Sequence, residues 1–238
     1  MKKLYLICLI LIIAVSAVWS QTGGTDTSKD AHFMIINAYS QDVFIRLSNS
    51  KNDVLYETDA MPPNDITLMH STPKTGFYFV DFKYNEADDW QPFYDEEDDD
   101  DVMVYLEPEL VCCLVIDGYG GIKENPLVLP ESDLPLVCFC NISDLKLNRM
   151  EIGIDYKNDF VAFTTDISAP GMTDFTPIAS GGYGLAWETE AAGANDEYAC
   201  ISNDDDSLKL FQFANNNIYV YGVVNSDAST AILYNITP

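Results

Sequence analysis

Two acidic segments are the first candidates for chemistry in this sequence, a run of seven consecutive acids from Asp95 to Asp101 and a shorter cluster around Asp204. Calcium takes six to eight oxygen ligands, and closely spaced carboxylates in a loop can supply them. A calcium site would draw on alternate acids of the run together with the cluster, namely Asp95, Glu97, Asp99, Asp101, Asp204 and Asp206. Neither segment has the spacing of a helical calcium loop. We therefore favour solvated hairpin loops, which also discourage pairing between sheet edges, and keep a docking patch for a basic partner as the other alternative.

Three aromatic residues precede the acidic run: Trp90, Phe93 and Tyr94. Aromatic faces stack on the apolar faces of sugars, and the nearby Asp88 and Asp89 can accept hydrogen bonds from hydroxyl groups. This pattern makes the three residues a candidate ligand-binding platform. The alternative, which we favour, is that they pack beneath a long loop or against a neighbouring domain.

Residues suited to catalysis are scarce. His32 and His70 are the only histidines, and neither stands in a metal-binding motif. The segment "IASGGYG" lacks the G-x-S-x-G pattern of a nucleophile elbow, so Ser180 is interpreted as a turn residue. Carboxylates are so numerous that a pair at glycosidase spacing would carry no information. The sequence therefore predicts a non-enzymatic protein with no cofactor, calcium being the one candidate.

Five cysteines follow the first 20 residues: Cys112, Cys113, Cys138, Cys140 and Cys200. They form no paired C-x-x-C sets, so they do not predict a zinc site. Neighbours in a strand point to opposite faces, which separates Cys112 from Cys113. We interpret the cysteines as small buried hydrophobic residues. One disulfide between the 112/113 and 138/140 pairs stays open.

The opening segment "MKKLYLICLILIIAVSAVWSQTGG" combines two lysines, an apolar stretch and small residues before a polar segment. This order is typical of a secretory signal peptide. We assign residues 1–20 to the signal peptide and residues 21–30 to a linker, with an uncleaved anchor as the alternative. The protein is thus predicted to be exported, to the periplasm, the cell surface or the exterior, with no transmembrane segment after cleavage.

The formal net charge of −26 limits the classes of partner. Nucleic acids and anionic lipids bind through clustered Lys and Arg, so this charge argues against both. Disordered acidic tails are also excluded, because 47% of the residues are hydrophobic. A protein or polysaccharide component of the bacterial envelope is the predicted partner.

From residue 31 onward, apolar and polar residues alternate with the period of two that is typical of strands. The order of segments then recurs: "HFMIINAYS" matches "PLVCFCNIS", and "DVMVYLEPELVCCLVIDG" matches "SLKLFQFANNNIYVYGVV". Glycine precedes an aromatic strand in both copies. The spacing of the copies is that of a domain, so we predict two tandem immunoglobulin-like antiparallel β-sandwiches, residues 31–130 and 131–238.

This pattern, with a first strand closed by Asn and a strand–turn–strand ending, resembles the bacterial AlgF-like family of extracytoplasmic β-sandwich proteins. That family includes the alginate O-acetylation accessory proteins and has no catalytic residues to transfer. The resemblance implies the location and the fold. The function predicted is a non-enzymatic binding or structural protein of the bacterial envelope. The alternatives are an accessory in surface-polysaccharide O-acetylation and a calcium-dependent carbohydrate-binding module.

Overall fold

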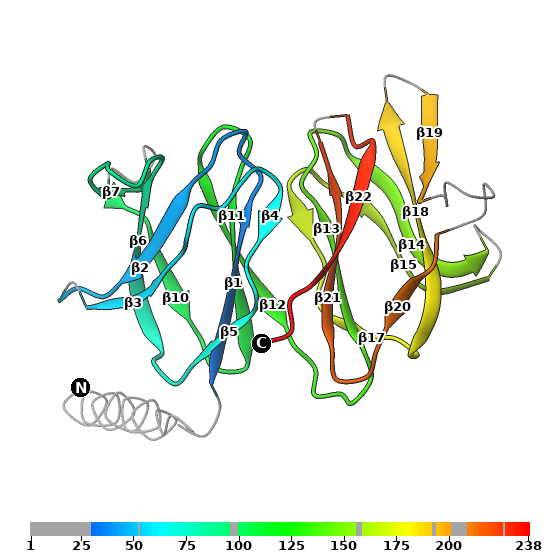
Figure 1. The fold of residues 1–238 in the computed structure, drawn as a ribbon, viewed down its shortest axis with the longest axis horizontal. Coiled ribbons are helices and arrows are strands. Elements are labelled where there is room, and N and C mark those ends of the chain that lie inside the picture. The colour runs from blue at the N-terminus through cyan, green and yellow to red at the C-terminus, as the bar shows by residue number, and fades with distance from the viewer. Residues whose placement is uncertain are drawn as a thin grey trace, which may run out of the picture.

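Strands account for all the regular structure that the computed structural model describes, which covers residues 30–51, 53–95, 100–155, 159–191, 194–200, 209–225 and 227–238. No helix occurs within these ranges, and hence none that is long and apolar enough to cross a membrane. The strands form stacked sheets (Figure 1). The predicted all-β class and β-sandwich architecture are confirmed.

The first unit, β1 to β12, consists of an inner and an outer sheet. The inner sheet has the order β12-β11-β1-β4, and β5 also pairs with β1; its strands are β1 (Ala31–Asn37), β4 (Asp65–Ile66), β5 (His70–Thr72), β11 (Leu110–Ile116) and β12 (Ile122–Val128). The outer sheet has the order β10-β6-β2-β3, and β7 also pairs with β6; its strands are β2 (Phe44–Ser48), β3 (Val54–Glu57), β6 (Gly76–Lys83), β7 (Gln91–Pro92) and β10 (Met103–Leu106). A separate hairpin consists of β8 (Tyr94–Asp95) and β9 (Asp100–Asp101).

The second unit, β13 to β22, repeats this plan. Its inner sheet has the order β22-β21-β13-β16, with β17 on β13, and contains β13 (Leu136–Asn141), β16 (Gly171–Met172), β17 (Thr176–Pro177), β21 (Ile218–Val224) and β22 (Thr230–Asn235). Its outer sheet has the order β15-β14-β18-β19, with β20 on β18, and contains β14 (Leu147–Asp155), β15 (Asp159–Ile167), β18 (Gly181–Ala191), β19 (Ala194–Ala199) and β20 (Phe211–Phe213). Strand by strand, β1, β2, β6, β11 and β12 correspond to β13, β14, β18, β21 and β22.

The pairing is antiparallel except at one place in each unit. The first strand of the unit runs parallel to the strand that follows the outer sheet, β1 beside β11 and β13 beside β21. The chain visits the outer sheet between these two strands, which gives it the long crossover that parallel neighbours need. The wholly antiparallel pattern expected from the sequence is thus interrupted at the centre of both inner sheets.

The two inner sheets pack face to face, so the sheets lie in the order outer, inner, inner, outer (Figure 1). Each unit has its own core between its inner and outer sheets. A third core, which we call the middle core, lies between the two inner sheets and contains Met34, Ile36, Ile66, Met69, Val111, Cys113, Val115, Leu127, Leu136, Cys138, Cys140, Ile142, Phe175, Val220, Val224 and Ile236. Inner strands are therefore buried on both faces, which explains why "LVCCLVI" and "LVCFCN" are continuous apolar runs rather than alternating ones.

Backbone hydrogen bonds join the units at equivalent places on opposite sides of the middle core. The amide of Met69 donates to the carbonyl of Ile236 at 2.8 Å, and the amide of Phe175 donates to the carbonyl of Val128 at 3.2 Å. Met69 lies between β4 and β5, as Phe175 lies between β16 and β17. The hydroxyl of Tyr234 also donates to the carbonyl of Asn64. The two predicted sandwiches therefore share a core and two backbone seams.

The cysteines occupy the cores, as the sequence predicts for Cys113 and for one of Cys138 and Cys140. All three are fully buried in the middle core, whereas Cys112 faces the core of the first unit. The described cysteines are free thiols. Burial raises the pKa of Cys138 to about 12 and holds the pKa of Cys113 well above its ordinary value. Such thiols are poor nucleophiles, which is consistent with a packing role.

Candidate functional site

The acidic run belongs to the β8–β9 hairpin. Its two flanks are described: Tyr94 pairs with Asp101, and Asp95 pairs with Asp100. Glu97, Asp99, Asp204 and Asp206 lie outside the described residues, as does the side chain of Asp95. Within the described part of the chain, no group of three or more His, Cys, Asp or Glu side chains is placed to hold a metal ion. The calcium site therefore stays a prediction.

The three candidate platform residues do not share one surface. Phe93 is 6% exposed and belongs to the core of the first unit, where its ring lies 4.4 Å from that of Phe82. Tyr94 is 53% exposed on the hairpin. Trp90 is half-buried, and the charged groups of Arg46 and Lys83 lie over its ring at 4.7 and 4.8 Å. Phe93 thus packs in the core of the first unit, so the three residues do not lie together on one surface, and ligand binding by Trp90 and Tyr94 stays a prediction.

A different aromatic surface lies on the solvent face of the first unit's outer sheet. Tyr105 pairs with Phe77 across β10 and β6, and their ring centroids are 4.8 Å apart. The next pair along these strands joins Met103 to Phe79. Phe77 is 64% exposed, and Met103 and Tyr105 are each nearly half exposed. We call Phe77, Phe79, Met103 and Tyr105 the aromatic face.

Polar and charged groups continue the same surface along the strands. Asp81 follows Phe79 on this side of β6, and it accepts hydrogen bonds from Nε and Nη2 of Arg46 at 3.0 and 2.7 Å. Lys83 comes next, paired with Phe44 on β2. Two residues along a strand span about 6.8 Å, so the surface from Phe77 to Lys83 is about 20 Å long. It presents apolar rings at one end and hydrogen-bonding groups at the other.

One strand of the sequence carries a pattern that indicates this surface. The strand "GFYFVDFK" has large apolar residues at consecutive positions, with Tyr78 and Val80 facing the core and Phe77 and Phe79 facing outward. In an inner strand such as β11, large apolar residues at consecutive positions are buried on both faces of the sheet. Asp81 and Lys83, which continue the outward series, show that the outward face meets solvent.

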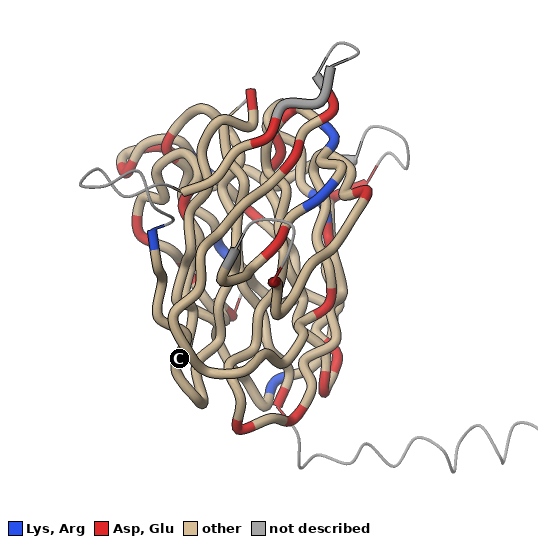
Figure 2. The backbone as a smooth tube through the Cα atoms, turned by 90° about the vertical axis from the view of Figure 1, so that its right-hand side faces the viewer, with Lys and Arg blue, Asp and Glu red and all other residues tan. Residues whose placement is uncertain are grey.

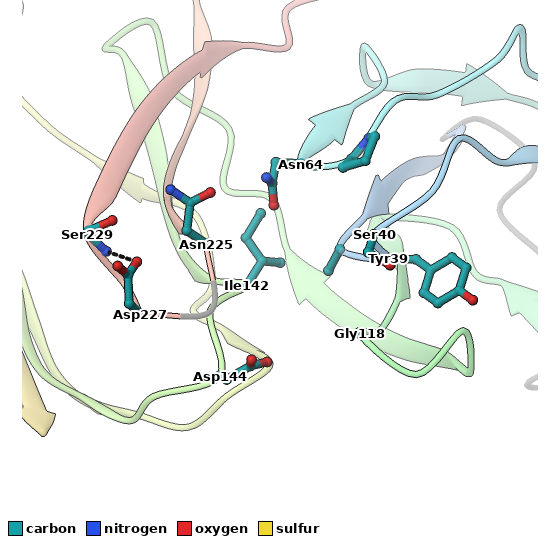
Figure 3. Close-up of a pocket in the computed structure, with 11 residues that line it drawn as sticks. Tyr39, Ser40, Asn64, Gly118, Ile142, Asp144, Asn225, Asp227 and Ser229 are labelled. Carbon is teal, nitrogen blue, oxygen red and sulfur yellow. Dashed lines mark hydrogen bonds between the residues drawn. The ribbon is translucent and has the colours of Figure 1, made fainter. Parts of the chain in front are cut away.

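A second candidate is a hollow of about 550 Å³ at one end of the stack, between the two units (Figure 3). Equivalent loops of the repeat border it. The lining residues are Ala38, Tyr39 and Ser40 after β1, Ile142 and Asp144 after β13, Gly118 after β11, and Asn225, Asp227 and Ser229 after β21. Asn64, from the segment before β4, faces it from the first unit (Figure 3).

Two buried asparagines position these loops. The Asn37 amide donates to the carbonyls of Gln41 and Met61, and its oxygen accepts from the amide of Tyr39. At the equivalent position, the Asn141 amide donates to the carbonyls of Leu145, Ile167 and Ser168, and its oxygen accepts from Ser143. Each side chain therefore ties the loop after the first strand to a more distant part of its unit. This explains why both first strands end in asparagine.

The hollow has the groups needed to hold a small polar molecule. An apolar floor that includes Ile142 is surrounded by polar side chains. These are the carboxylates of Asp144 and Asp227, the amides of Asn64 and Asn225, and the hydroxyl of Ser229. Hydrogen bonding from Ser229, whose amide lies 3.1 Å from Oδ1, lowers the pKa of Asp227, which keeps it ionised. An ionised, exposed carboxylate is a poor general acid or base at neutral pH. The hollow is open, and its chemistry is that of binding.

The two histidines take up structural positions. His70 lies against Phe33 and Tyr56, with ring centroids 5.2 and 4.1 Å away, and burial lowers its pKa. Nδ1 of His32 lies 2.8 Å from the hydroxyl of Ser71, and burial lowers its pKa as well. His32 also borders a third hollow of about 680 Å³ at the opposite end of the inner sheets. Although His32 contacts the Ser71 hydroxyl and has Asp30 nearby, no hydrogen bond joins either imidazole to an orienting acid among the described residues, as a catalytic triad requires.

No protein-family model and no curated protein sequence matches this chain. Among the solved structures that match, two cover most of this chain. The Bacillus anthracis TIE protein is 11% identical with a TM-score of 0.26; the match covers 83% of this chain and 34% of that one, so this chain spans about a third of its length. The module CBMbc, of family CBM26, from Eubacterium rectale Amy13K was solved with maltoheptaose; it is 9% identical with a TM-score of 0.28, and the match covers 87% of this chain and 98% of the module. Likeness at these TM-scores carries no functional argument. The resemblance to the alginate O-acetylation accessory family stays a prediction.

Proposed function

We propose that this protein is a non-enzymatic binding protein of the bacterial envelope or exterior, and that it binds an uncharged polysaccharide on the aromatic face. The observation that carries the proposal is the pair formed by Phe77 and Tyr105. Two rings in contact on the solvent side of a sheet, one of them 64% exposed, leave apolar surface in water. Exposed apolar surface of this kind marks binding sites in soluble proteins.

The arrangement suits a sugar chain better than a compact ligand. The apolar faces of sugar rings stack on aromatic side chains, while hydroxyl groups need donors and acceptors close by. Asp81, Arg46 and Lys83 provide these groups further along the same strands. The length of about 20 Å accommodates several sugar units. A formal charge of −26 repels polyanions, which favours an uncharged chain.

The location in the proposal rests on the opening segment of the sequence. Two lysines, an apolar stretch and small residues form the pattern of an export signal. Export would bring the protein to the polysaccharides of the envelope or the surroundings. No metal ion takes part in the proposed binding, because the aromatic face and the charged groups beside it supply both the stacking and the hydrogen bonds.

The test is a glycan array followed by affinity electrophoresis in gels that contain the polysaccharide bound. The double variant Phe77→Ala/Tyr105→Ala should weaken retention about tenfold or more, since stacking of an aromatic ring contributes about 0.5–1.5 kcal/mol beyond its buried area. Phe163→Ala is the matched control, because it removes a similarly exposed ring from the outer sheet of the second unit. Binding should be the same in calcium and in a chelator.

The proposal fails if the double variant binds as the wild type does, or if only Phe163→Ala weakens binding. A protein that binds no polysaccharide on the array also contradicts it. Binding that disappears with the chelator would instead support the calcium-dependent module expected as an alternative from the sequence.

A further inference from the structure

The long edge strand of the second unit's outer sheet, β15, differs from the equivalent edge of the first unit. An uncovered edge strand exposes backbone donors and acceptors to any strand that can pair with them. Each inner sheet is joined to the other unit by the seams at Met69–Ile236 and Val128–Phe175. β15 is the outermost strand of its sheet, is nine residues long, and has no strand on its other side among the described residues.

The composition of β15 favours pairing. Its central residues, "FVAFTT" at 160–165, contain no charge, proline or glycine. Phe160, Val161 and Phe163 are 39%, 37% and 49% exposed. The two rings meet at 4.7 Å, and the guanidinium of Arg149 on β14 lies 5.2 Å from each. An added strand would find its backbone partners at the edge and an aromatic cluster on the adjoining sheet face.

The repeat provides an internal comparison. The equivalent edge of the first unit is β3, which has four residues and includes the acidic Glu57. Short edges and charged side chains are the usual means of preventing strand addition. The first unit has both features, whereas the uncharged centre of β15 has neither. The register shifts in the β14–β15 ladder lie between Asp159 and Ala162, and the pairing from Ala162 to Thr165 is regular.

Charge decides what kind of strand fits. Acidic residues stand at both ends of the uncharged segment, Asp159 and Asp166, and the latter is bridged to Lys146 at 2.7 Å. Each copy of the protein carries a formal charge of −26, so two copies repel one another. Figure 2, which looks onto this side of the molecule, shows many acidic residues and few Lys or Arg. The complementary partner is a basic one.

We propose that β15 is a docking edge for strand addition by a partner protein, whose extended segment is apolar or aromatic at its centre and carries Lys or Arg at its ends. Backbone hydrogen bonds along β15 provide affinity, and alternate side chains contacting Phe160 and Phe163 provide selectivity. The site is separate from the aromatic face of the first unit. An experiment that refutes strand addition at β15 therefore leaves the polysaccharide proposal untouched, and the reverse also holds.

The test uses the whole mature chain and three labelled nine-residue peptides. They share a centre of alternating Val and Thr with one Phe and end in Lys, Gln or Glu on both sides. By fluorescence anisotropy at low salt, the Lys-ended peptide should bind about tenfold more tightly than the Glu-ended one, and added sodium chloride should reduce the difference. Hydrogen exchange should show new protection of amides in 159–167.

Val161→Lys places a charge on the docking edge and should weaken binding of the Lys-ended and Gln-ended peptides about tenfold. The matched control is Val54→Lys on β3, another exposed valine on the equivalent edge, which should leave binding unchanged. Equal binding of all three peptides, binding unaffected by Val161→Lys, or no binding of the Lys-ended peptide would each overturn the proposal. So would dimerisation through β15, detected by light scattering and abolished by Val161→Lys, because a second copy would then be the occupant.

Discussion

Separating the two units should leave neither of them stably folded. Each unit contributes eight buried side chains to the middle core. Three of the sixteen are cysteines, so the first unit contributes seven large apolar side chains and the second unit six. Burying a large apolar side chain stabilises a protein by about 1.5–3 kcal/mol, so exposing six of them costs roughly 9 kcal/mol even at the lower figure. The stability of a whole protein is typically about 5–15 kcal/mol. Residues 30–131 and 132–238, each expressed alone, are therefore expected to be partly unfolded or aggregated, and to regain structure when co-expressed.

Tryptophan fluorescence provides the assay in the intact chain, because Trp90 lies in the first unit and Trp187 is buried in the second. In the chain from Gln21 onward, which lacks Trp19, the variants Trp90→Phe and Trp187→Phe each keep a single tryptophan, and each reports on one unit during urea denaturation. We expect coincident transitions, as two-state unfolding requires. Two transitions with separate midpoints, or a single unit that melts cooperatively on its own, would refute the reasoning and show that the middle core adds little stability.

Other predictions concern single side chains. Asn37→Ala and Asn141→Ala should each lower the free energy of unfolding in urea by about 2–3 kcal/mol, because buried carbonyls lose their donors; a change as small as that of the exposed Asn215→Ala would count against this. Ellman's reagent should leave Cys113 unmodified in the native protein and modify it after unfolding; rapid native reaction would contradict its burial. Folding lowers the pKa of His70, so the unfolded state takes up a proton more readily than the folded state does. The contribution of the neutral His70 to the free energy of unfolding is therefore present above about pH 6.5 and is lost as the pH falls below that value. His70→Phe should therefore flatten the dependence of the urea midpoint on pH between about 5 and 6.5; parallel curves for the two proteins would rule this out.

Local patterns were sufficient to predict much of the fold. Alternation identified the strands, and the recurrence of "HFMIINA" as "PLVCFCN" identified a repeated plan that the strand order also has. Alternation did not reveal that strands such as "LVCCLVI" are buried on both faces, nor what covers the second face. Only the assembled sheets show that the cover is the other unit. The outward series that Asp81 and Lys83 continue indicates the exposure of Phe77, but no comparable pattern in the sequence indicates the burial of Phe93.

The sharing of a core by distant parts of the chain has a consequence for synthesis. The hydrogen bond between Asn64 and Tyr234 joins residues 170 positions apart. While the ribosome is still making β21 and β22, the inner sheet of the first unit lacks the part of its cover that Val220, Val224 and Ile236 provide. Folding rates fall as contacts become more distant in sequence, and long-lived intermediates with bare sheets are prone to aggregate. A nascent chain of this design stays incompletely folded until late in translation, and the export proposed for this protein would meet the chain in that state.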